Sequence, residues 1–407
     1  MATLPGSASD CEALIAYDAA QSRLATHSIP LGIERASLAK AGRRAVAEAV
    51  YARIDSPRAD TAAMDGYAVR NADIDTGQRA FPVTGTHFAG GASTSPLTPG
   101  SAVRIMTGAP LPAGADRVVM LEQVRLEGDR VILPQTLSAK VHVRRRASDF
   151  AAGDTLLKPG RVIDPRALLI AAAADVAELA VWRRPRVGFL STGDELTDPG
   201  NAAATTSDIP DCLAEAVALL ARQWGAKPAG AARVADDAEA IRGAAEGALA
   251  DCNVLVVIGG ASRGDRDFAR LALLPLGLDL VFADVAIKPG KPVWYGRIGA
   301  QHVLGLPGNP TAAMTVARLF LAPLLTGLDG RGTDAALVPT MLPLADDAPT
   351  AIREQFLCGH ADGAGVRIIE RQMASSQAML RNADMIVRIP GGAAPSPAGT
   401  SVATFRF

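Results

Sequence analysis

Four loops concentrate glycine, proline and charged side chains directly after predicted strands. Glycines let backbone amides close on an anion, while carboxylates and lysines supply metal ligands and counter-charge. A well-packed α/β domain does not need this many charged turns merely to fold. The loops therefore predict a site for a phosphate-bearing ligand held with a divalent cation. Their sequences are FLSTGDEL (Phe189–Leu196), VVIGGASRGDRDF (Val256–Phe268), AIKPGKP (Ala286–Pro292) and GLPGNPT (Gly305–Thr311).

The first two loops offer carboxylates and hydroxyls next to glycines. Asp194 and Glu195 directly follow a predicted strand, and adjacent carboxylates on a turn are natural ligands for Mg2+, which prefers oxygen. The structural alternative is an acidic pair favoured by a helix dipole. In the second loop Asp267 could reach a metal or a ligand N–H group, and a simple structural turn is the alternative. The accompanying backbone and hydroxyl contacts are expected from Ser191, Thr192, Gly193, Gly259, Gly260 and Ser262.

The other two loops offer positive charge and backbone amides. Lys288 and Lys291 lie on a turn stiffened by prolines, and two rigidly presented ammonium groups suit a tetrahedral oxyanion or a phosphate. Solvated surface lysines are the alternative. The GLPGNPT loop leads into a helix near Pro310, whose N-terminal amides form an anion site. An N-cap by Asn309 is compatible with that role. The expected ligand contacts there are Pro307, Gly308, Asn309 and Thr311.

Two upstream segments carry further acidic and basic side chains. The stretch PRADTAAMDGYAVR contains Asp65, and the stretch RRRASDF contains Asp149 after Arg144–Arg146. The three arginines could form a solvated face or could grip a phosphate. None of the five histidines has metal-ligand spacing, so we expect all of them to be structural.

The composition of the chain limits the function classes. With 407 residues, 49% of them hydrophobic and 20% charged, the chain predicts an ordinary globular protein of about two to four domains. Its formal net charge of −1 provides no global field for nucleic acid or anionic membranes, so any polyanion site must be local. The four scattered cysteines are typical of reduced thiols in a cytoplasmic protein. We expect no signal peptide and no transmembrane helix.

The elements that must position the loops follow from periodicity and turn signals. Residues 11–51 are predicted to be helical, and short β-like runs between Ile54 and Val143 predict a small β-rich module. From Val187 strands alternate with helices, which predicts a parallel, doubly wound sheet. Ligands bind such sheets outside the carboxyl ends of the strands, where all four loops fall. After Gly330 a β-rich tail predicts a separate barrel.

Seven segments together resemble the motifs of the molybdopterin molybdenumtransferase family, which includes bacterial MoeA and the C-terminal domain of gephyrin. The resemblance extends along nearly the whole chain, and the motifs occur in the family's order. One such motif is a weak signal, whereas seven in order make the chain similar to this family as a whole. The motifs are AAMDGYAVR, VRIMTGAPLPAGADRVVMLEQV, RRR-x-x-D, STGDEL, GG-x-S-x-GDRDF, AIKPGKP and GLPGNP.

The resemblance implies an α/β multidomain protein that forms a homodimer. In this family an elongated, largely helical dimerisation segment is assembled from two stretches of chain, here 1–50 and 144–182. A small β-rich domain is inserted between them at 51–143. A doubly wound α/β domain of the molybdopterin-binding type would span 183–328, and a C-terminal β-barrel would span 329–407.

The resemblance also implies an activity in molybdenum cofactor biosynthesis. Family members bind adenylylated molybdopterin and molybdate, hydrolyse the adenylate in a divalent-metal-dependent step that releases AMP, and insert molybdenum into the dithiolene. The implied cofactor here is Mg2+. The implied protein partners are a molybdopterin adenylyltransferase and client molybdoenzymes, with no nucleic acid and no membrane.

The same resemblance assigns roles to the charged residues of the motifs. Lys288 and Lys291 would hold molybdate or the pterin phosphate. Asp65 and Asp149 would complete the cleft across the dimer interface. The carboxylates around Mg2+ and the adenylate would be those of Asp194, Glu195 and Asp267.

Several positions depart from the family's pattern, most of them on the side of the expected oxyanion donors. Losing one such donor typically lowers a rate by about two to three orders of magnitude. Two hypotheses follow, a complete enzyme or a catalytically reduced paralogue that carries molybdopterin to a client molybdoenzyme. The carboxylate trio favours the enzyme, and the missing donors favour the carrier. The departures are Ala59, Ala62, Leu213, Asp284, Ala312 and Cys358.

Overall fold

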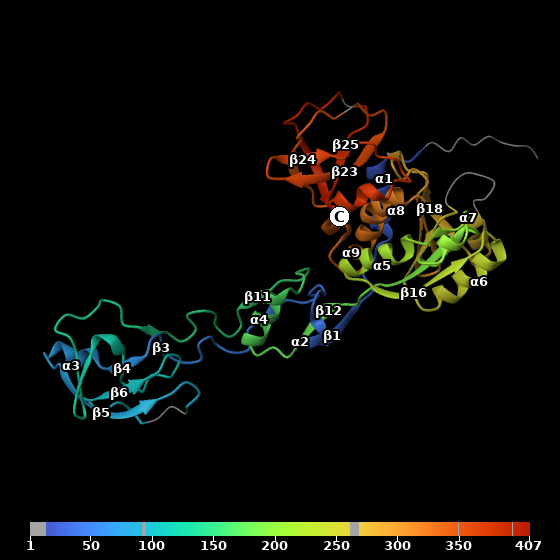
Figure 1. Cartoon of the computed structure of the whole chain (residues 1–407). Coiled ribbons are helices and arrows are strands. Elements are labelled where there is room, and N and C mark those ends of the chain that lie inside the picture. The colour runs from blue at the N-terminus through green and yellow to red at the C-terminus, as the bar shows by residue number, and fades with distance from the viewer. Residues whose placement is uncertain (1–13, 92–94, 261–267, 349, 393) are drawn as a thin grey trace, which may run out of the picture. The chain divides into compact units, whose positions relative to one another are not determined.

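Two compact units make up the chain (Figure 1). The computed structural model describes residues 14–91, 95–260, 268–348, 350–392 and 394–407. The first unit comprises the residues up to Glu34, Arg43–Ala47 and Val181–Phe407. The second comprises Arg35–Gly42 and Glu48–Ala180.

A six-stranded sheet forms the centre of the first unit, with the order β16-β13-β17-β21-β20-β18. The first four strands are parallel, as the alternation of strands and helices predicts. At the far edge β20 pairs antiparallel with β21, and β18 pairs antiparallel with β20, which the sequence analysis did not anticipate. The strands span Arg186–Thr192 (β13), Lys227–Val234 (β16), Val254–Ile258 (β17), Asp279–Ala283 (β18), Trp294–Ile298 (β20) and Gln301–Leu306 (β21).

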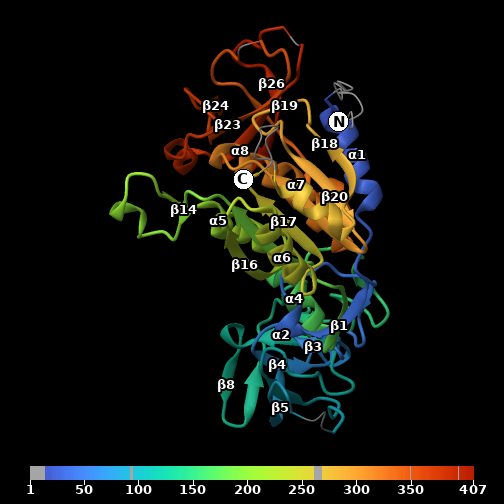
Figure 2. The same cartoon turned by 90° about the vertical axis from the view of Figure 1, so that its right-hand side faces the viewer.

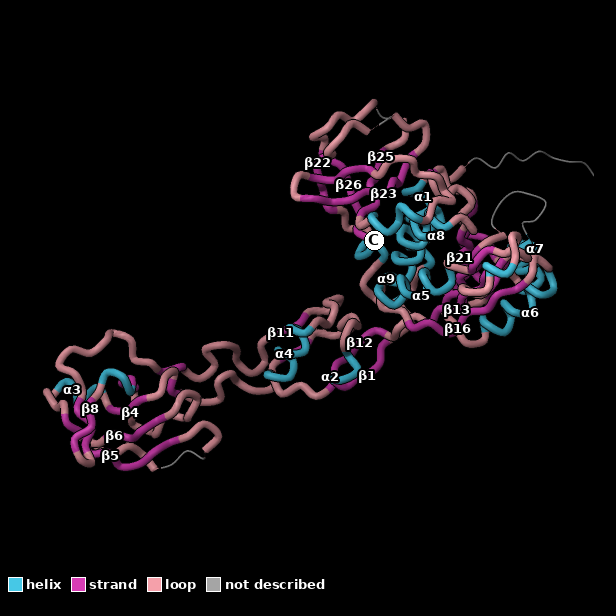
Figure 3. Tube along the Cα trace, in the orientation of Figure 1, coloured by secondary structure: helices cyan, strands magenta, loops and turns pink. Residues whose placement is uncertain are grey.

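Helices cover both faces of this sheet, which confirms the doubly wound prediction (Figure 3). Val254, Val256 and Ile258 of β17 belong to one core, together with side chains of α1, α5, α8 and α9. Leu255 and Val257 alternate with them and pack against α6 and α7 in the other core. The helices span Tyr17–His27 (α1), Leu213–Gln223 (α5), Ala238–Leu249 (α6), Phe268–Leu273 (α7), Pro310–Val316 (α8) and Ala322–Leu328 (α9).

α8 continues through a π-helical segment at Ala317–Leu321 into α9. The combined stretch Pro310–Leu328 is long and apolar enough to cross a membrane, but 94% of that window is buried inside the molecule. A helix that is hydrophobic all round is typical of a protein core. Its apolar composition is therefore explained by its place in the first core.

The prediction that residues 11–51 are helical was wrong for much of the N-terminal region. The described part of residues 11–51 is helical only in α1 and in the short helix α2, with strands between and after them. Gly32 adopts a φ of +100°, a conformation that interrupts a helical pattern. α1 packs its Tyr17 and Leu24 into the first core and lies beside β18 (Figure 2). The remaining elements span Ile33–Ser37 (β1), Leu38–Ala41 (α2) and Val50–Tyr51 (β2).

The C-terminal residues of the first unit form a second six-stranded sheet, with the order β19-β23-β25-β26-β22 and β24 paired to β23. Leu344 bridges to Val366, so the chain after β22 meets β24 and the two ends of the sheet approach each other. β19 comes from the AIKPGKP loop and pairs in parallel with β23. The strands span Ile287–Lys288 (β19), Thr340–Pro343 (β22), Glu354–Asp362 (β23), Gly365–Ile368 (β24), Met385–Ile389 (β25) and Ser401–Arg406 (β26).

The second unit contains a β-rich sheet with the order β7-β4-β6-β5-β9-β8. Its main core gathers apolar side chains that include Tyr67, Phe81 and Val131. The strands of this sheet span Gly66–Val69 (β4), Ala80–His87 (β5), Ala102–Ile105 (β6), Arg117–Met120 (β7), Arg125–Glu127 (β8) and Arg130–Ile132 (β9).

Short elements complete the second unit. Helix α4 begins with Pro165 after Asp164, whose Oδ1 accepts a hydrogen bond from the Ala167 amide at 2.8 Å. An Asp N-cap followed by proline is a strong helix start. The other elements are Thr61–Ala62 (β3), Asn71–Asp75 (α3), Val143–Arg144 (β10), Thr155–Leu157 (β11) and Pro165–Ala173 (α4). Strand β12 (Glu178–Trp182) begins in the second unit and ends in the first, which resumes at Val181.

Candidate functional site

A cavity of about 530 Å3 lies in the first unit at the carboxyl ends of β13, β17 and β21. The prediction that the loops after these strands converge is therefore confirmed for the residues that line it. Pro292, at the end of the AIKPGKP loop, also reaches it. The predicted site residues that line the cavity are Thr192, Glu195, Gly259, Gly260, Pro307, Gly308 and Asn309.

The last two residues of β13 carry buried hydroxyls, and Thr192 lines the cavity. Ser191 and Thr192 are buried, and neither side-chain oxygen has a hydrogen-bond partner in the part of the chain that the structure describes. Gly193 is buried too, and a Cβ at this position would lie 2.9 Å from Oε2 of Glu195, so the carboxylate folds back over the glycine. Oδ1 of Asp194 accepts a hydrogen bond from the Asp236 amide at 3.0 Å. A buried hydroxyl without a partner is costly, and a ligand in the cavity would supply the partner of Thr192.

The loop after β17 brings its backbone close to the end of β13. A Cβ on Gly259 would lie 2.6 Å from the carbonyl oxygen of Thr192 and 2.9 Å from its Oγ1. Gly259 and Gly260 also have φ angles of +94° and +58°, a region that favours glycine. Ser262 and Asp267, the other predicted members of this loop, lie outside the described residues.

The lysine loop is held between the two sheets of the first unit. Lys288 is exposed and belongs to β19, which joins the C-terminal sheet. Lys291 is half-buried, and its carbonyl oxygen accepts a hydrogen bond from the Val285 amide at 2.9 Å. A Cβ on Gly290 would lie only 2.3 Å from Cγ2 of Val316, so the loop packs directly on α8.

The N-terminus of α8 differs from the predicted anion site in one respect. Asn309 occupies the N-cap position, but within the described residues its side chain makes no capping hydrogen bond. Thr311 is 2% exposed, and both of its donors are engaged by a loop of the C-terminal domain. Its amide donates to the Ala374 carbonyl at 3.1 Å, and its hydroxyl donates to the Ser376 carbonyl.

Several cavity residues escaped the sequence analysis as site residues. Ser375 and Gln377 line the cavity from the C-terminal domain, far along the chain from the other loops. Asp211 also lines it, and its Oδ1 accepts hydrogen bonds from the Leu213 and Ala214 amides at the start of α5. Cys212 is exposed at the cavity wall, and partial burial raises the pKa of its thiol. The family resemblance matches the stretches around Cys212 and Ser375 only loosely, and long-range packing brings them to the cavity.

Asp65, one of the two predicted carboxylates in the second unit, is fixed by a local hydrogen-bond pattern. Its Oδ1 accepts hydrogen bonds from the Thr107 hydroxyl at 2.6 Å and from the Thr107 amide at 2.7 Å. These bonds hold the pKa of Asp65 below its usual value. Asp149 is exposed, and its Oδ2 lies 3.4 Å from the Ser56 hydroxyl.

The neighbouring arginines have structural partners. Arg145 pairs with Asp60 and Arg146 pairs with Asp55, each at 2.5 Å. The backbone amide of Arg146 also donates to Asp60, which is the main reason that the pKa of this carboxyl is lowered. The arginine run therefore contributes ion pairs within the second unit, in addition to any role toward a phosphate.

The donor chemistry at the cavity fits a hard divalent cation. Asp194 and Glu195 are adjacent carboxylates, and Oγ1 of Thr192 is a neighbouring oxygen that has no partner among the described residues. Mg2+ takes one or two carboxylates together with waters and ligand phosphates. Among the described residues no three His, Cys, Asp or Glu side chains converge on one point, so a cation here would need oxygens from a bound ligand or from the undescribed part of the second loop.

Two family models match consecutive parts of the chain. The MoeA N-terminal region (domain I and II) matches residues 15–174, and a probable molybdopterin binding domain matches residues 188–327. The molybdopterin molybdenumtransferase of Synechococcus elongatus is 33% identical over 344 residues, which cover 82% of this chain and 84% of that protein. The molybdopterin molybdenumtransferase of Haemophilus influenzae is 33% identical over 320 residues, 78% of each chain.

Solved structures match over almost the full length. A crystal structure of the molybdopterin biosynthesis MoeA protein from Pyrococcus horikoshii has a TM-score of 0.81 and 28% identity, and covers 97% of this chain and 99% of that chain. A structure of a molybdopterin biosynthesis MoeA protein from Pyrococcus horikoshii OT3 has a TM-score of 0.82 at 24% identity. These matches confirm the predicted α/β multidomain fold.

Proposed function

Because this chain belongs to the molybdopterin molybdenumtransferase family, we propose that its cavity binds adenylylated molybdopterin together with molybdate. The protein is an enzyme of molybdenum cofactor biosynthesis. The placement rests on the convergence of the β13, β17 and β21 loops on one cavity, which is also lined by Thr192, a buried residue whose hydroxyl has no hydrogen-bond partner among the described residues. Ligands of parallel sheets bind at this edge.

The residues present divide into an acidic and a basic side. Asp194 and Glu195 would hold Mg2+, with Asp267 from the undescribed loop as a third carboxylate. The ion supplies charge neutralisation on phosphate oxygens. The backbone at Gly259 and Gly260 leaves room for close approach of a phosphate. Lys288 and Lys291 supply positive charge toward molybdate or the pterin phosphate.

These residues would act mainly by positioning the substrates and by stabilising charge in the transition state. Cleavage of a phosphoanhydride needs little covalent help from the protein. An oxygen of water or molybdate attacks the pterin-side phosphorus of the P–O–P anhydride, and the bond from that phosphorus to the bridging oxygen breaks. AMP leaves with the bridging oxygen, and the pterin phosphate keeps the attacking oxygen. The chain's part is to hold the two anions side by side and to offset their charge.

The assembly around the site is also part of the proposal. The protein acts as a cytoplasmic homodimer in which Asp65 and Asp149 complete the cleft of the partner copy, as the family resemblance suggests. Its substrate would come from a molybdopterin adenylyltransferase, and its product would go to client molybdoenzymes. The missing oxyanion donors favour the carrier hypothesis, but the curated relatives are molybdopterin molybdenumtransferases, which supports the enzyme.

The first test is AMP release from adenylylated molybdopterin by the purified protein, with Mg2+ and with or without molybdate. Molybdate-stimulated, Mg2+-dependent release supports the proposal, and chelation of the cation should stop it. Tight substrate binding without AMP release would instead identify a carrier that kept the cavity and lost the chemistry.

The residue roles can be tested in the same assay. Asp267→Asn should abolish adenylate turnover with little loss of fold stability, and an unchanged rate would remove Asp267 from the site. Lys288→Ala combined with Lys291→Ala should weaken the dependence on molybdate more than the binding of the adenylate. Saturation by molybdate that matches the parent protein would contradict the assignment of the lysines.

A further inference from the structure

The loop between β24 and β25 in the C-terminal sheet also reaches the cavity. Its residues Ser375 and Gln377 line the cavity together with Asn309 and Pro310 at the start of α8. Both side chains are exposed and polar. They are therefore available to a ligand in the cavity, provided that the loop is held in place.

The first anchor of this loop is Gln372. Its Oε1 accepts a hydrogen bond from the Cys358 amide at 2.8 Å, and its Nε2 donates to the carbonyl oxygens of Cys358 and Ile369 at 2.7 Å each. These bonds fix the start of the loop to β23. They leave the residues after Gln372 to be fixed by other contacts.

The second anchor is Thr311 in the first turn of α8. Its amide donates to the Ala374 carbonyl at 3.1 Å, and its hydroxyl donates to the Ser376 carbonyl. The two accepting carbonyls flank Ser375 in the chain. Thr311 is 2% exposed and has a single hydroxyl proton, which is already donated, so its side chain is not available to the ligand as a donor.

We propose that Thr311 is a positioning residue, whose hydroxyl holds the loop so that Ser375 and Gln377 face the oxyanion bound in the cavity. This role rests on the function proposed above and replaces the direct ligand contact that the sequence suggests for Thr311. β19, which carries Lys288, joins the same C-terminal sheet through β23, and the loop that contains it reaches the cavity at Pro292. A change at Thr311 should therefore alter anion binding without touching the anion.

The test compares three variants of α8 in the full-length protein. Thr311→Val removes the hydroxyl at nearly constant volume and should raise the KM for molybdate roughly fivefold, the order expected for one lost hydrogen bond, with a smaller change in kcat. Thr311→Ser keeps the hydroxyl and should restore most of the affinity. Thr315→Val is the matched control, since Oγ1 of Thr315 is fully buried on the same helix and has no partner among the described residues.

A double-mutant cycle separates positioning from a general effect on stability. If Thr311 acts through the loop, Thr311→Val should cost much less affinity in a Gln377→Ala background than in the parent protein. Equal costs in the two backgrounds, or an equal rise of KM in Thr315→Val, would overturn the inference.

Amide hydrogen exchange provides a readout that does not need turnover. Residues 374–377 should exchange faster in Thr311→Val than in the parent or in Thr315→Val, because the Ser376 amide bonds to Met373 within this loop. Unchanged exchange would show that the hydroxyl does not hold the loop and would overturn the proposal. If the parent protein releases no AMP, the proposed function is wrong. The exchange comparison would still show whether the Thr311 hydroxyl holds the loop, because it does not require turnover.

Discussion

Two features of the structure require glycine at position 259. Its φ of +94° strains any other residue, and a Cβ would lie 2.6 Å from the Thr192 carbonyl oxygen. Gly259→Ala should therefore lower the free energy of unfolding and displace the loop that approaches the ligand. Gly200→Ala is the control, since its φ is +102° but no atom lies within 4 Å of an added Cβ.

The comparison isolates the steric part of the effect. The control should lose at most about 1–3 kcal/mol, the usual cost of backbone strain. Gly259→Ala should lose more and should also reduce adenylate turnover. Equal stability of the two variants, measured by urea unfolding, would mean that the β17 loop can move away from Thr192 at no cost.

Cys212 allows a chemical test of the cavity at the same scale. It is exposed at the cavity wall, whereas Cys252 and Cys358 are buried, and burial raises the pKa of Cys358 to about 11. Because the thiolate is the reactive form, iodoacetamide should modify Cys212 well before the two buried thiols. Adenylylated molybdopterin should slow this labelling. Peptide mass spectrometry measures each site, and labelling that ignores the ligand would place the substrate elsewhere.

At the scale of elements, local patterns predicted the strands and loops, while long-range pairing escaped them. The unbroken apolar run Val254–Ile258 indicates a strand buried on both faces, and the loop after it lies at the cavity as expected. The pairing of β19 with β23 and the contact of Thr311 with Ser376 join segments about 65 residues apart. Neither contact can be predicted from the local sequence, because hydrogen bonds to backbone carbonyls require no particular side chain on the partner residue.

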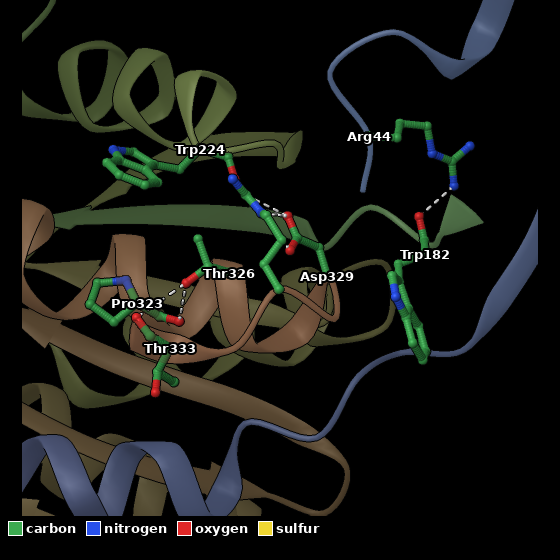
Figure 4. A network of polar contacts seen from close by, with 8 residues as sticks. Arg44, Trp182, Trp224, Pro323, Thr326, Asp329 and Thr333 are labelled. Carbon is green, nitrogen blue, oxygen red and sulfur yellow. Dashed lines mark hydrogen bonds and ion pairs between the residues drawn. The ribbon is translucent and has the colours of Figure 1, made fainter. Parts of the chain in front are cut away.

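The end of α9 shows how an element is fixed by a buried ion pair (Figure 4). Nη2 of Arg331 donates to Oδ2 of Asp329 at 2.6 Å and to the Trp224 carbonyl at 2.8 Å, which ties α9 to the end of α5. Asp329 is 5% exposed, and burial raises the pKa of its carboxyl despite the arginine. Arg331→Met would leave that carboxylate without its counter-ion.

The expected loss for Arg331→Met is about 3–5 kcal/mol near neutral pH. It should shrink as the pH falls, because a carboxyl whose pKa is raised by folding stabilises the folded state only in its protonated form. Adding Asp329→Leu should recover much of the loss. Tryptophan fluorescence during urea unfolding measures all three proteins, and a loss that does not change with pH would rule out the stranded carboxylate as its cause.

At the scale of the whole molecule, the proposed machinery is divided between the two units. The cavity, Lys288 and Lys291 belong to the first unit, whereas Asp65 and Asp149 belong to the second. All three tryptophans of the chain, Trp182, Trp224 and Trp294, also lie in the first unit. Fluorescence therefore reports on the first unit alone, and the contribution of the second unit must be tested through activity.

Subunit mixing tests whether Asp65 serves the cavity of a partner copy. Asp65→Asn and the variant with both lysines changed to alanine should each lose most of the molybdate-stimulated AMP release as homodimers. If the carboxylate acts across the interface, each mixed dimer contains one site with intact lysines from one chain and an intact Asp65 from the other. An equal mixture, exchanged by mild denaturation and refolding, should then regain about a quarter of the parent activity, since half of the dimers are mixed and each has one working site of two.

A mixture that forms heterodimers, shown with differently tagged chains, yet stays inactive would place both groups in the same chain's site. The parent protein carried through the same exchange controls for losses in refolding, so the recovered fraction measures only how the second unit is shared.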